Sequence, residues 1–278
     1  MGYNNNEALA VMEAFQLPDT RSDDAIFSNE DLADDMEGLR LTFQKVKIPS
    51  GGTLQFELPS DDPENPDYAK TLEGIIIYNH ASGAYWMEGS EYDEDSTPLC
   101  TTVDGKVGIG EPGGSCAICP FNQFRSAPDG KGKACKNMRV LYLLRDGDFL
   151  PLQLKLPPTS IRPFTEFYNT VFAPRRRATY GSVVQIGLKR ADNGTNVYSV
   201  ATFKKLFDFS GEKLMAVKAC ADSFREQIKM LNQQHAADNE NRCEDAFSAD
   251  DGYVMQGDGE SFCITSDAIN GDREELPA

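Results

Sequence analysis

The sequence predicts a mainly β fold with two helices, and three observations support this prediction. Between residues 39 and 210, short apolar runs alternate with polar residues at a period of two, which is typical of strands. Two turn sequences, Asp146-Gly147-Asp148 and Asp192-Asn193-Gly194, each separate a pair of such runs and therefore predict hairpins. Apolar residues at helical spacing occur over 159–173 and again over 211–235.

The first part of the chain predicts an acidic arm followed by strands. Residues 1–38 are polar and acidic, and Glu7–Leu17 is compatible with one amphipathic helix that Pro18 ends. The strands that the alternation predicts next cover 39–48, 53–58 and 72–79, and 84–88 either continues the last of them or pairs with it. An acidic loop from Pro59 to Pro66 separates the second strand from the third.

The second part predicts a hairpin, a helix, a second hairpin and a final helix. The hairpins cover 138–156 and 182–207, and the helix between them, 159–173, begins after Pro157-Pro158 with Thr159 or Ser160 as its cap and ends at Pro174. Three strands, a helix and two strands follow one another in the order of an OB-fold barrel. Other small β-barrels with one helix fit the order nearly as well.

The predicted organisation is therefore a barrel between acidic flanks. It has an acidic N-terminal arm (1–38), an OB-like β-barrel domain (39–210) with a zinc-binding insertion at 97–137, a C-terminal helix (211–235) and an acidic tail (236–278). The longest apolar runs are far shorter than the roughly 20 residues of a membrane helix. The first residues lack the basic start of a secretion signal. We therefore expect a soluble, cytoplasmic protein without a membrane partner.

Charge is distributed unevenly along the chain. The net charge is −17, yet residues 100–235 carry 20 basic and 11 acidic side chains, a net of +9. Residues 1–99 carry −16 and residues 236–278 carry −10. A basic middle between acidic flanks favours an anionic partner such as nucleic acid, which a uniformly acidic protein would repel.

Four of the seven cysteines are grouped with the spacing Cys100-x15-Cys116-x2-Cys119-x15-Cys135. A Cys-x-x-Cys pair with two further cysteines can complete a tetrahedral shell, so we expect one structural zinc ion per chain, held by Cys100, Cys116, Cys119 and Cys135. Free or redox-active thiols are the alternative for the group, and His80 is an alternative ligand in place of Cys100.

The cysteine segment carries a resemblance to a known group of proteins. The stretches Gly113-Gly-Ser-Cys116-Ala-Ile-Cys119-Pro-Phe-Asn-Gln-Phe124 and Gly130-Lys-Gly-Lys-Ala-Cys135, followed by Pro157-Pro158-Thr159-Ser160, resemble little-characterised four-cysteine proteins of bacteriophages and mobile elements. They are similar to zinc-containing phage single-stranded-DNA-binding proteins, although those use one histidine and three cysteines at shorter spacings. The resemblance implies an OB barrel with an inserted zinc subdomain that acts in DNA replication or recombination in the host bacterial cytoplasm.

Cations and aromatic residues of the middle segment fit single-stranded DNA as a partner. Cations follow phosphates while aromatic faces stack on bases. The candidate nucleic-acid-binding residues are Phe121, Phe124, Lys131, Lys133, Lys136, Arg139, Arg175, Arg176, Arg177, Tyr180, Lys189 and Arg190. The helical spacing of Phe164, Phe167 and Phe172 instead predicts core positions. Three adjacent arginines repel one another, so Arg175–Arg177 need a phosphate or a carboxylate partner.

Three function hypotheses follow. The first is a non-enzymatic single-stranded-DNA-binding protein of phage or mobile-element replication or recombination. The second is a zinc-ribbon module for protein interaction or transcription, and the third is a metal-dependent nucleic-acid enzyme. The chain has only two histidines, His80 and His235, and no P-loop, so it offers few of the residues that an enzyme acting on nucleic acid would use. The acidic tail either competes with DNA for its groove, recruits replication or recombination proteins, or serves solubility.

Overall fold

The structure is a computed structural model that describes residues 15–17, 43–62, 64–86, 98–194 and 196–248, and for 234–248 only the main chain. It forms two compact units, which are described separately here: residues 1–79 with 139–227, and residues 80–138 with 228–278. In the described ranges the fold is mainly β with two α-helices, as predicted. The acidic arm, nearly all of the helix predicted over Glu7–Leu17, and the tail beyond Ser248 lie outside those ranges.

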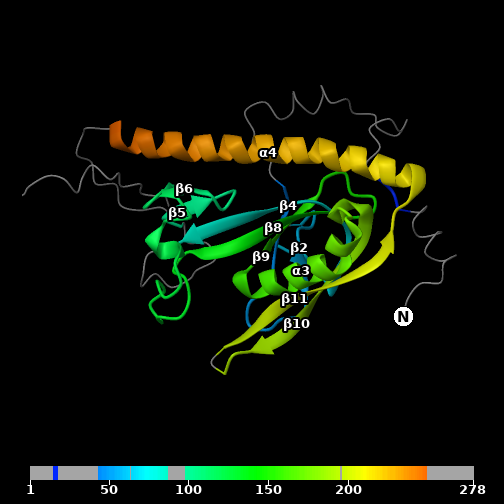
Figure 1. Cartoon of the computed structure of the whole chain (residues 1–278), viewed down its shortest axis with the longest axis horizontal. Coiled ribbons are helices and arrows are strands. Elements are labelled where there is room, and N and C mark those ends of the chain that lie inside the picture. The colour runs from blue at the N-terminus through cyan, green and yellow to red at the C-terminus, as the bar shows by residue number, and fades with distance from the viewer. Residues whose placement is uncertain (1–14, 18–42, 63, 87–97, 195, 249–278) are drawn as a thin grey trace, which may run out of the picture. The chain divides into compact units, whose positions relative to one another are not determined.

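One sheet organises the first unit (Figure 1). Its strands follow the order β1-β9-β8-β4, and β10 pairs with β4 on one side and with β11 on the other. Their bounds are β1 (Lys45–Lys47), β4 (Thr71–Tyr85), β8 (Lys136–Leu144), β9 (Leu152–Leu156), β10 (Ser182–Asp192) and β11 (Val197–Asp208). A Cβ on Gly74 of β4 would lie 2.4 Å from the carbonyl oxygen of Leu144, so only glycine fits there.

Both predicted hairpins are confirmed. β8 and β9 pair antiparallel from Arg139 opposite Leu156 to Leu143 opposite Leu152, across the predicted turn. β10 and β11 pair antiparallel over their whole length, with one register shift between Val183 and Val184. The predicted strands at 72–79 and 84–88 form one strand, since β4 runs without interruption from Thr71 to Tyr85.

The predicted closed barrel is not found in the described residues. Closure would require β9 to pair with β11, and no such pair is present among the strands that the structure describes. The reason is that β9 already has neighbours on both edges: β8 lies antiparallel on one side and β1 lies parallel on the other, with Val46 opposite Leu154. Since each strand edge accepts one partner, β1 occupies the position that a closing strand would need.

The segment between β1 and β4 folds into a small sheet that the sequence did not fully predict. β2 (Phe56–Leu58) lies within the predicted strand 53–58, but β3 (Asp67–Ala69) was not predicted and pairs antiparallel with β2. Phe56 and Leu58 are buried in the main core, so this small sheet closes one side of it.

Helix α3 (Pro158–Val171) packs against β11 and β9 and confirms the predicted helix (Figure 1). Phe164 and Phe172 are buried, and Phe167 packs against the same core, as their spacing predicted. The predicted cap is wrong, because the capping position is Pro157 and no side chain caps the helix. The hydroxyl of Ser160 is instead buried, where it accepts a hydrogen bond from the backbone N–H of Ala201 at 3.0 Å.

Two 3-10 helices and the final α-helix complete the chain. η2 (Ala173–Arg175) and η3 (Thr179–Gly181) connect α3 to β10. α4 (Gly211–Ser248) is longer than the predicted 211–235. The prediction stopped where the sequence becomes acidic, but no glycine or proline follows Gly211 before Gly252, so nothing in the chain interrupts the helix.

Short strands and turns form the described cysteine segment of the second unit. β5 (Cys100–Thr102) pairs with β4 and with β6 (Val107–Gly110), and β7 (Gly114–Ser115) pairs with β6. η1 (Pro120–Asn122) follows the Cys-x-x-Cys pair. The insertion predicted at 97–137 therefore contains short strands and a 3-10 helix among its described residues.

Candidate functional site

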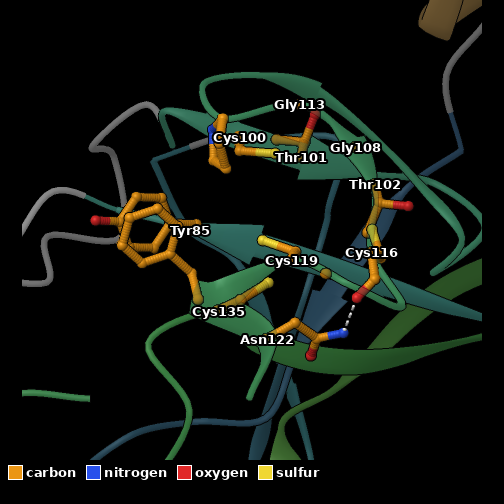
Figure 2. Close-up of a pocket in the computed structure, with 13 residues that line it drawn as sticks. Tyr85, Cys100, Thr101, Thr102, Gly108, Gly113, Cys116, Cys119, Asn122 and Cys135 are labelled. Carbon is orange, nitrogen blue, oxygen red and sulfur yellow. Dashed lines mark hydrogen bonds between the residues drawn. The ribbon is translucent and has the colours of Figure 1, made fainter. Parts of the chain in front are cut away.

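The four grouped cysteines line one small cavity of about 10 Å³ in the second unit. Cys100 starts β5, Cys116 follows β7, Cys119 precedes η1 and Cys135 precedes β8. In Figure 2 the side chains of all four lie around the same space. A cavity of this size holds a single water-sized occupant. The structure thus brings together the four residues that the spacing predicted as ligands.

Backbone and side-chain hydrogen bonds hold the cysteine loops in place. The N–H of Cys116 donates to the carbonyl of Lys106 at 2.8 Å, and the N–H of Cys135 donates to the carbonyl of Phe121 at 2.8 Å. The side-chain amide of Asn122 donates to the carbonyl of Cys116 at 2.7 Å (Figure 2). Segments separated by up to 14 residues are therefore connected independently of the sulfur atoms.

Glycine at position 108 leaves the space that the sulfur of Cys100 occupies. A Cβ on Gly108 would lie 2.8 Å from the sulfur of Cys100, which is closer than side chains tolerate. A Cβ on Gly83 would lie 3.0 Å from a methyl group of Thr102 and 3.6 Å from the sulfur of Cys135. The absence of a side chain at Gly108 therefore leaves room for the Cys100 sulfur, while the tight contact at Gly83 is with Thr102.

The thiols stand apart from one another in this structure. In the described ranges, no three Cys, His, Asp or Glu side chains are arranged as a metal ion would require, and Cys100, Cys116, Cys119, Cys135 and Cys220 are all free thiols. Burial raises the pKa of Cys135 to about 11, and the three neighbouring cysteines add to the effect. Burial raises the pKa of Cys100 and Cys116 as well. A cation among the sulfur atoms would favour the thiolate forms of Cys100, Cys116 and Cys135, since metal ligands bind as thiolates.

His80 does not line this cavity. Its Nδ1 lies 2.8 Å from the carbonyl oxygen of Ala81, and its Nε2 lies 3.4 Å from the side-chain nitrogen of Asn232. Of the two ligand sets considered from the sequence, the arrangement favours four cysteines.

An exposed aromatic ring and three lysines lie beside the cysteine loops; we refer to Phe124, Lys131, Lys133 and Lys136 as the loop patch. The Phe124 side chain is 76% exposed, and the ammonium of Lys133 lies over its ring, 5.1 Å from the centroid. Lys133 also donates to the side-chain oxygen of Asn122 at 3.1 Å. The loop patch offers an aromatic face with a cation already beside it.

Phe121 has a different place from the other predicted aromatic residue of the loop. Its ring stacks on Tyr85 with centroids 4.2 Å apart and planes 18° apart. Both side chains line the cysteine cavity. Phe121 is therefore in a position to support the loop, while Phe124 faces outward.

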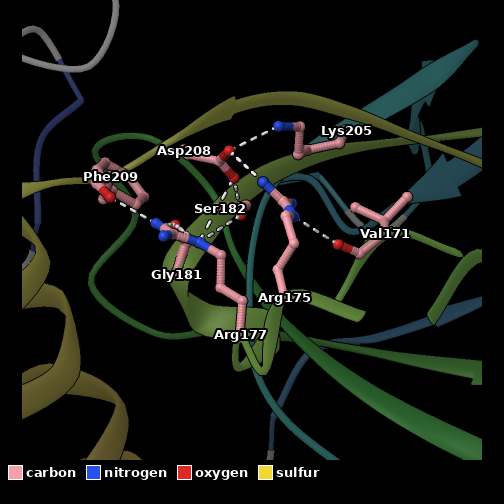
Figure 3. Close-up of polar contacts among 8 residues, drawn as sticks. All are labelled: Val171, Arg175, Arg177, Gly181, Ser182, Lys205, Asp208 and Phe209. Carbon is pink, nitrogen blue, oxygen red and sulfur yellow. Dashed lines mark hydrogen bonds and ion pairs between the residues drawn. The ribbon is translucent and has the colours of Figure 1, made fainter. Parts of the chain in front are cut away.

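Arg175 and Arg177 have a carboxylate partner in the first unit, which was one of the two partners expected from the sequence. Figure 3 shows both guanidinium groups at Asp208, the last residue of β11. Arg175 donates to Asp208 at 2.8 Å, and Nε of Arg177 lies 3.5 Å from it. Arg177 also donates to the carbonyl oxygens of Gly181 and Phe209. These contacts join Arg175 of η2 to the end of β11, and Arg177 to the residues that flank the second hairpin. A role of the two arginines in nucleic-acid binding stays a prediction.

Three further predicted cations of the first unit are exposed, namely Arg176, Lys189 and Arg190. Lys189 and Arg190 lie on β10 near its hairpin turn, and Arg176 follows η2. Arg176 has a φ of 48°, in the left-handed region that favours glycine.

Arg139 and Tyr180 meet at a second cavity, of about 430 Å³, in the first unit. Sequence analysis did not predict the other polar residues that line it, among them Asn79, Tyr168 and Arg225. Tyr168 lies within the helix predicted over 159–173, where its spacing does not distinguish it from the core residues Phe164 and Phe172. Their common feature, aromatic rings interleaved with arginine, appears only once β4, α3 and α4 are folded.

A lysine stripe was also missed. Lys45 and Lys47 of β1 are exposed, and Lys47 lies opposite Lys155 of β9. Burial and the charges of Lys45 and Lys47 lower the pKa of Lys155. The stripe depends on a parallel pairing between segments more than 100 residues apart, which no local pattern signals.

Comparison with known proteins identifies no relative: no protein-family model, no curated protein and no solved structure matches the chain. The resemblance to phage proteins thus stays a prediction from the residues quoted above. None of the helices in the described ranges combines the length and the apolar character needed to cross a membrane.

Proposed function

We propose that the protein binds single-stranded nucleic acid, with DNA as the first candidate, and that the loop patch forms part of the binding surface. The observation that carries the proposal is the exposed ring of Phe124 with the Lys133 ammonium 5.1 Å from its centroid. Single-strand-binding proteins combine such rings, on which bases stack, with cations that follow the phosphates. Unstacked bases are available in single strands, whereas duplex bases are not, so the patch favours single strands.

The charge map and the strand order support the proposal. The segment 100–235 carries a net charge of +9 between acidic flanks. The order β9-β8-β4-β10-β11 is that of the five strands of an OB barrel opened between the third and the fifth, and OB folds commonly bind single strands. Action in phage or mobile-element replication or recombination stays a prediction.

A structural zinc ion is the second part of the proposal. Cys100, Cys116, Cys119 and Cys135 would hold it, because they line one ion-sized cavity and Gly108 leaves room for the sulfur atom of Cys100. Zinc in a four-thiolate shell supplies folding energy and performs no chemistry on a substrate. The chain's own contribution is to hold Phe124 and the three lysines on the loops that follow Cys119.

Fluorescence anisotropy with a mixed-sequence single strand tests the binding proposal. We expect Phe124→Ala to weaken binding about tenfold, since stacking contributes about 1–3 kcal/mol per base. Phe124→Tyr keeps the ring and should bind like the wild type. The matched control is Ile118→Ala on the same loops, because Ile118 is 82% exposed but has no aromatic face.

The salt dependence gives a second readout. Lys131→Ala and Lys133→Ala should each reduce the slope of log affinity against log salt by about 0.7, the value for one single-strand phosphate contact. Equal binding by Phe124→Ala and the wild type, with both proteins folded, would refute the loop patch as the nucleic-acid surface.

Ile118 also supports the alternative of a protein-interaction module. It lies between Cys116 and Cys119 and is 82% exposed, as an apolar anchor for a protein partner would be. Under this alternative, Ile118→Ala abolishes capture of that partner while nucleic acid does not bind to any variant. The same two substitutions therefore discriminate between the functions.

A further inference from the structure

The second cavity lies within the first unit, among β4, β8, α3, η3 and α4. Its volume is about 430 Å³, within the range of about 300–1,000 Å³ that is usual for small-molecule sites. The lining residues that matter here are Asn79, Arg139, Phe164, Tyr168, Tyr180 and Arg225. None of the described residues that line it is acidic.

Arg139 is the half-buried cation of this cavity. Its guanidinium donates to the side-chain oxygen of Asn79, through Nε at 2.8 Å and also through a terminal nitrogen, and lies 5.6 Å from the ring centroid of Phe164. Among the described residues no carboxylate forms an ion pair with Arg139, so the guanidinium lines the cavity as a cation without a described counterion. Burial lowers the pKa of Arg139, which reflects the cost of holding its charge away from water.

A partly buried guanidinium that has no carboxylate beside it lacks a counterion. Arginine presents its donors in a planar fork that matches phosphate and carboxylate oxygens. Arg225, at the same cavity, does have a carboxylate neighbour, since it donates to Asp222 at 2.9 Å. Arg139 therefore stands out as the position that an anion from outside the described chain would complete.

Aromatic rings line the same cavity as this anion position. Tyr168 is 39% exposed and Tyr180 is partly buried, and both line the cavity with Arg139. A planar ligand group can stack on a tyrosine ring, and the side-chain nitrogen of Asn79 can donate to a ring acceptor. Together, the lining fits one ligand that carries both an anion and a flat aromatic group.

We infer that this cavity is a binding site for one nucleotide unit, with its phosphate at Arg139 and its base against Tyr168 or Tyr180. The site stands on residues of the first unit and does not depend on the loop patch, so either can fail without the other. The nucleotide has two possible sources, a free mononucleotide or the phosphorylated end of a strand. Both present the same phosphate and base.

Titration calorimetry with dAMP, deoxyadenosine and inorganic phosphate tests the inference on the full chain. We expect dAMP to bind at least about tenfold more tightly than either part alone, because both halves of the site are then used. Phosphate binding as tightly as dAMP would overturn the assignment to a nucleotide. A second titration with a 5′-phosphorylated and a 5′-hydroxyl oligonucleotide identifies a strand end, if the phosphorylated one binds more tightly.

Two variants and a control connect the binding to this cavity. Arg139→Gln and Tyr168→Ala should each weaken nucleotide binding about tenfold or more, while Tyr168→Phe keeps the ring and the affinity. Arg139 is half-buried, so Arg139→Gln could fail to fold. In that case Tyr168→Ala alone tests the cavity. Arg162→Gln is the matched control, since Arg162 lies on the same helix, is 86% exposed and does not line the cavity.

The outcomes separate this inference from the proposed function. Loss of nucleotide binding in Tyr168→Ala but not in Phe124→Ala or Arg162→Gln supports the cavity. If neither the mononucleotide nor the phosphorylated end binds, or if both bind unchanged to a folded Tyr168→Ala protein, the inference is overturned. Single-strand affinity that depends on Phe124 would survive either of these results.

Discussion

Replacing Asp208 by asparagine tests whether this carboxylate holds the second hairpin to η2. Asp208 accepts hydrogen bonds from Arg175 at 2.8 Å, Lys205 at 2.6 Å and Ser182 at 2.5 Å (Figure 3). Asparagine keeps the size of the side chain but removes its charge, so Arg175 and Arg177 are left without their counterion. The perturbation is therefore electrostatic rather than steric.

The expected loss of stability follows from how exposed these contacts are. The side chains of Arg175, Lys205 and Asp208 are 43%, 29% and 28% exposed, so water screens the contacts in part. Partly exposed ion pairs contribute about 0.2–1 kcal/mol each, and a hydrogen bond to a charged group contributes somewhat more. We expect a loss of about 2 kcal/mol for the whole cluster, which lowers the melting temperature by about 4–8 °C.

The pH dependence of the stability tests whether the loss in the Asp208 variant is electrostatic. Burial alone would raise the pKa of Asp208. The hydrogen bonds from Arg175, Lys205 and Ser182 nevertheless hold this pKa well below its ordinary value. The stabilisation is therefore fully present above the unfolded pKa of about 3.9 and is lost as the pH falls through the lower folded pKa. The difference between wild type and variant should be constant from about pH 5 to pH 8 and shrink below about pH 4.

Urea unfolding followed by circular dichroism measures the difference at each pH. The control is Asp222→Asn on α4, whose carboxylate pairs with Lys218 and Arg225 but is more exposed, so its effect should be smaller. A variant as stable as the wild type at pH 7 would refute the structural role of Asp208. A difference that persists unchanged at pH 3 would refute the electrostatic origin of the loss.

Three further predictions concern metal, charge and the acidic tail. Cys119→Ser should reduce bound zinc, measured by atomic emission, from about one ion per chain to none. Hydrogen exchange in the cysteine segment should become faster. A wild-type protein that holds no metal and is fully stable in chelator would contradict the zinc proposal. Arg176→Gly should weaken single-strand binding and lower the salt slope by about 0.7 without loss of stability, since glycine accepts the φ of 48°; unchanged affinity would exclude Arg176 from the binding surface. Four acidic residues of the tail, Asp250, Asp251, Asp258 and Glu260, can be neutralised while Phe247, Tyr253 and Phe262 are kept. If the tail competes with DNA, this variant should bind DNA more tightly than the wild type at low salt. A weaker or unchanged affinity in anisotropy titrations would rule out competition.

The elements that the sequence predicted well are those fixed by neighbouring residues. Asp146-Gly147-Asp148 and Asp192-Asn193-Gly194 specify turns by their own backbone preferences, so both hairpins could be located to within a few residues. The apolar spacing of α3 likewise identified Phe164 and Phe172 as core residues. The four cysteines could be grouped because a metal-ligand spacing is itself a local signal.

The features that sequence analysis missed depend on distant segments. β1 pairs with β9 over three residues, and neither the choice of partner nor the parallel direction is written in a local pattern. The position of Ser160 in the sequence predicts a helix cap, but its hydroxyl accepts a hydrogen bond from the N–H of Ala201, which is possible only when β11 packs on α3. The arginine triplet could not be separated into paired and exposed members, because Asp208 reaches it from 33 residues away.

The lysines of β1 have a consequence for how the protein behaves at high concentration. β1 is the last strand of its sheet in the described ranges, and such an edge invites pairing with the same edge of a second copy. That pairing would bring Lys45 and Lys47 of each copy against those of the other, and like charges directly opposite one another are destabilising. The Lys-Val-Lys sequence therefore keeps the inward valine for the core while it discourages sheet-to-sheet association and aggregation. Replacing both lysines by threonine would remove that protection, and light scattering would detect the association.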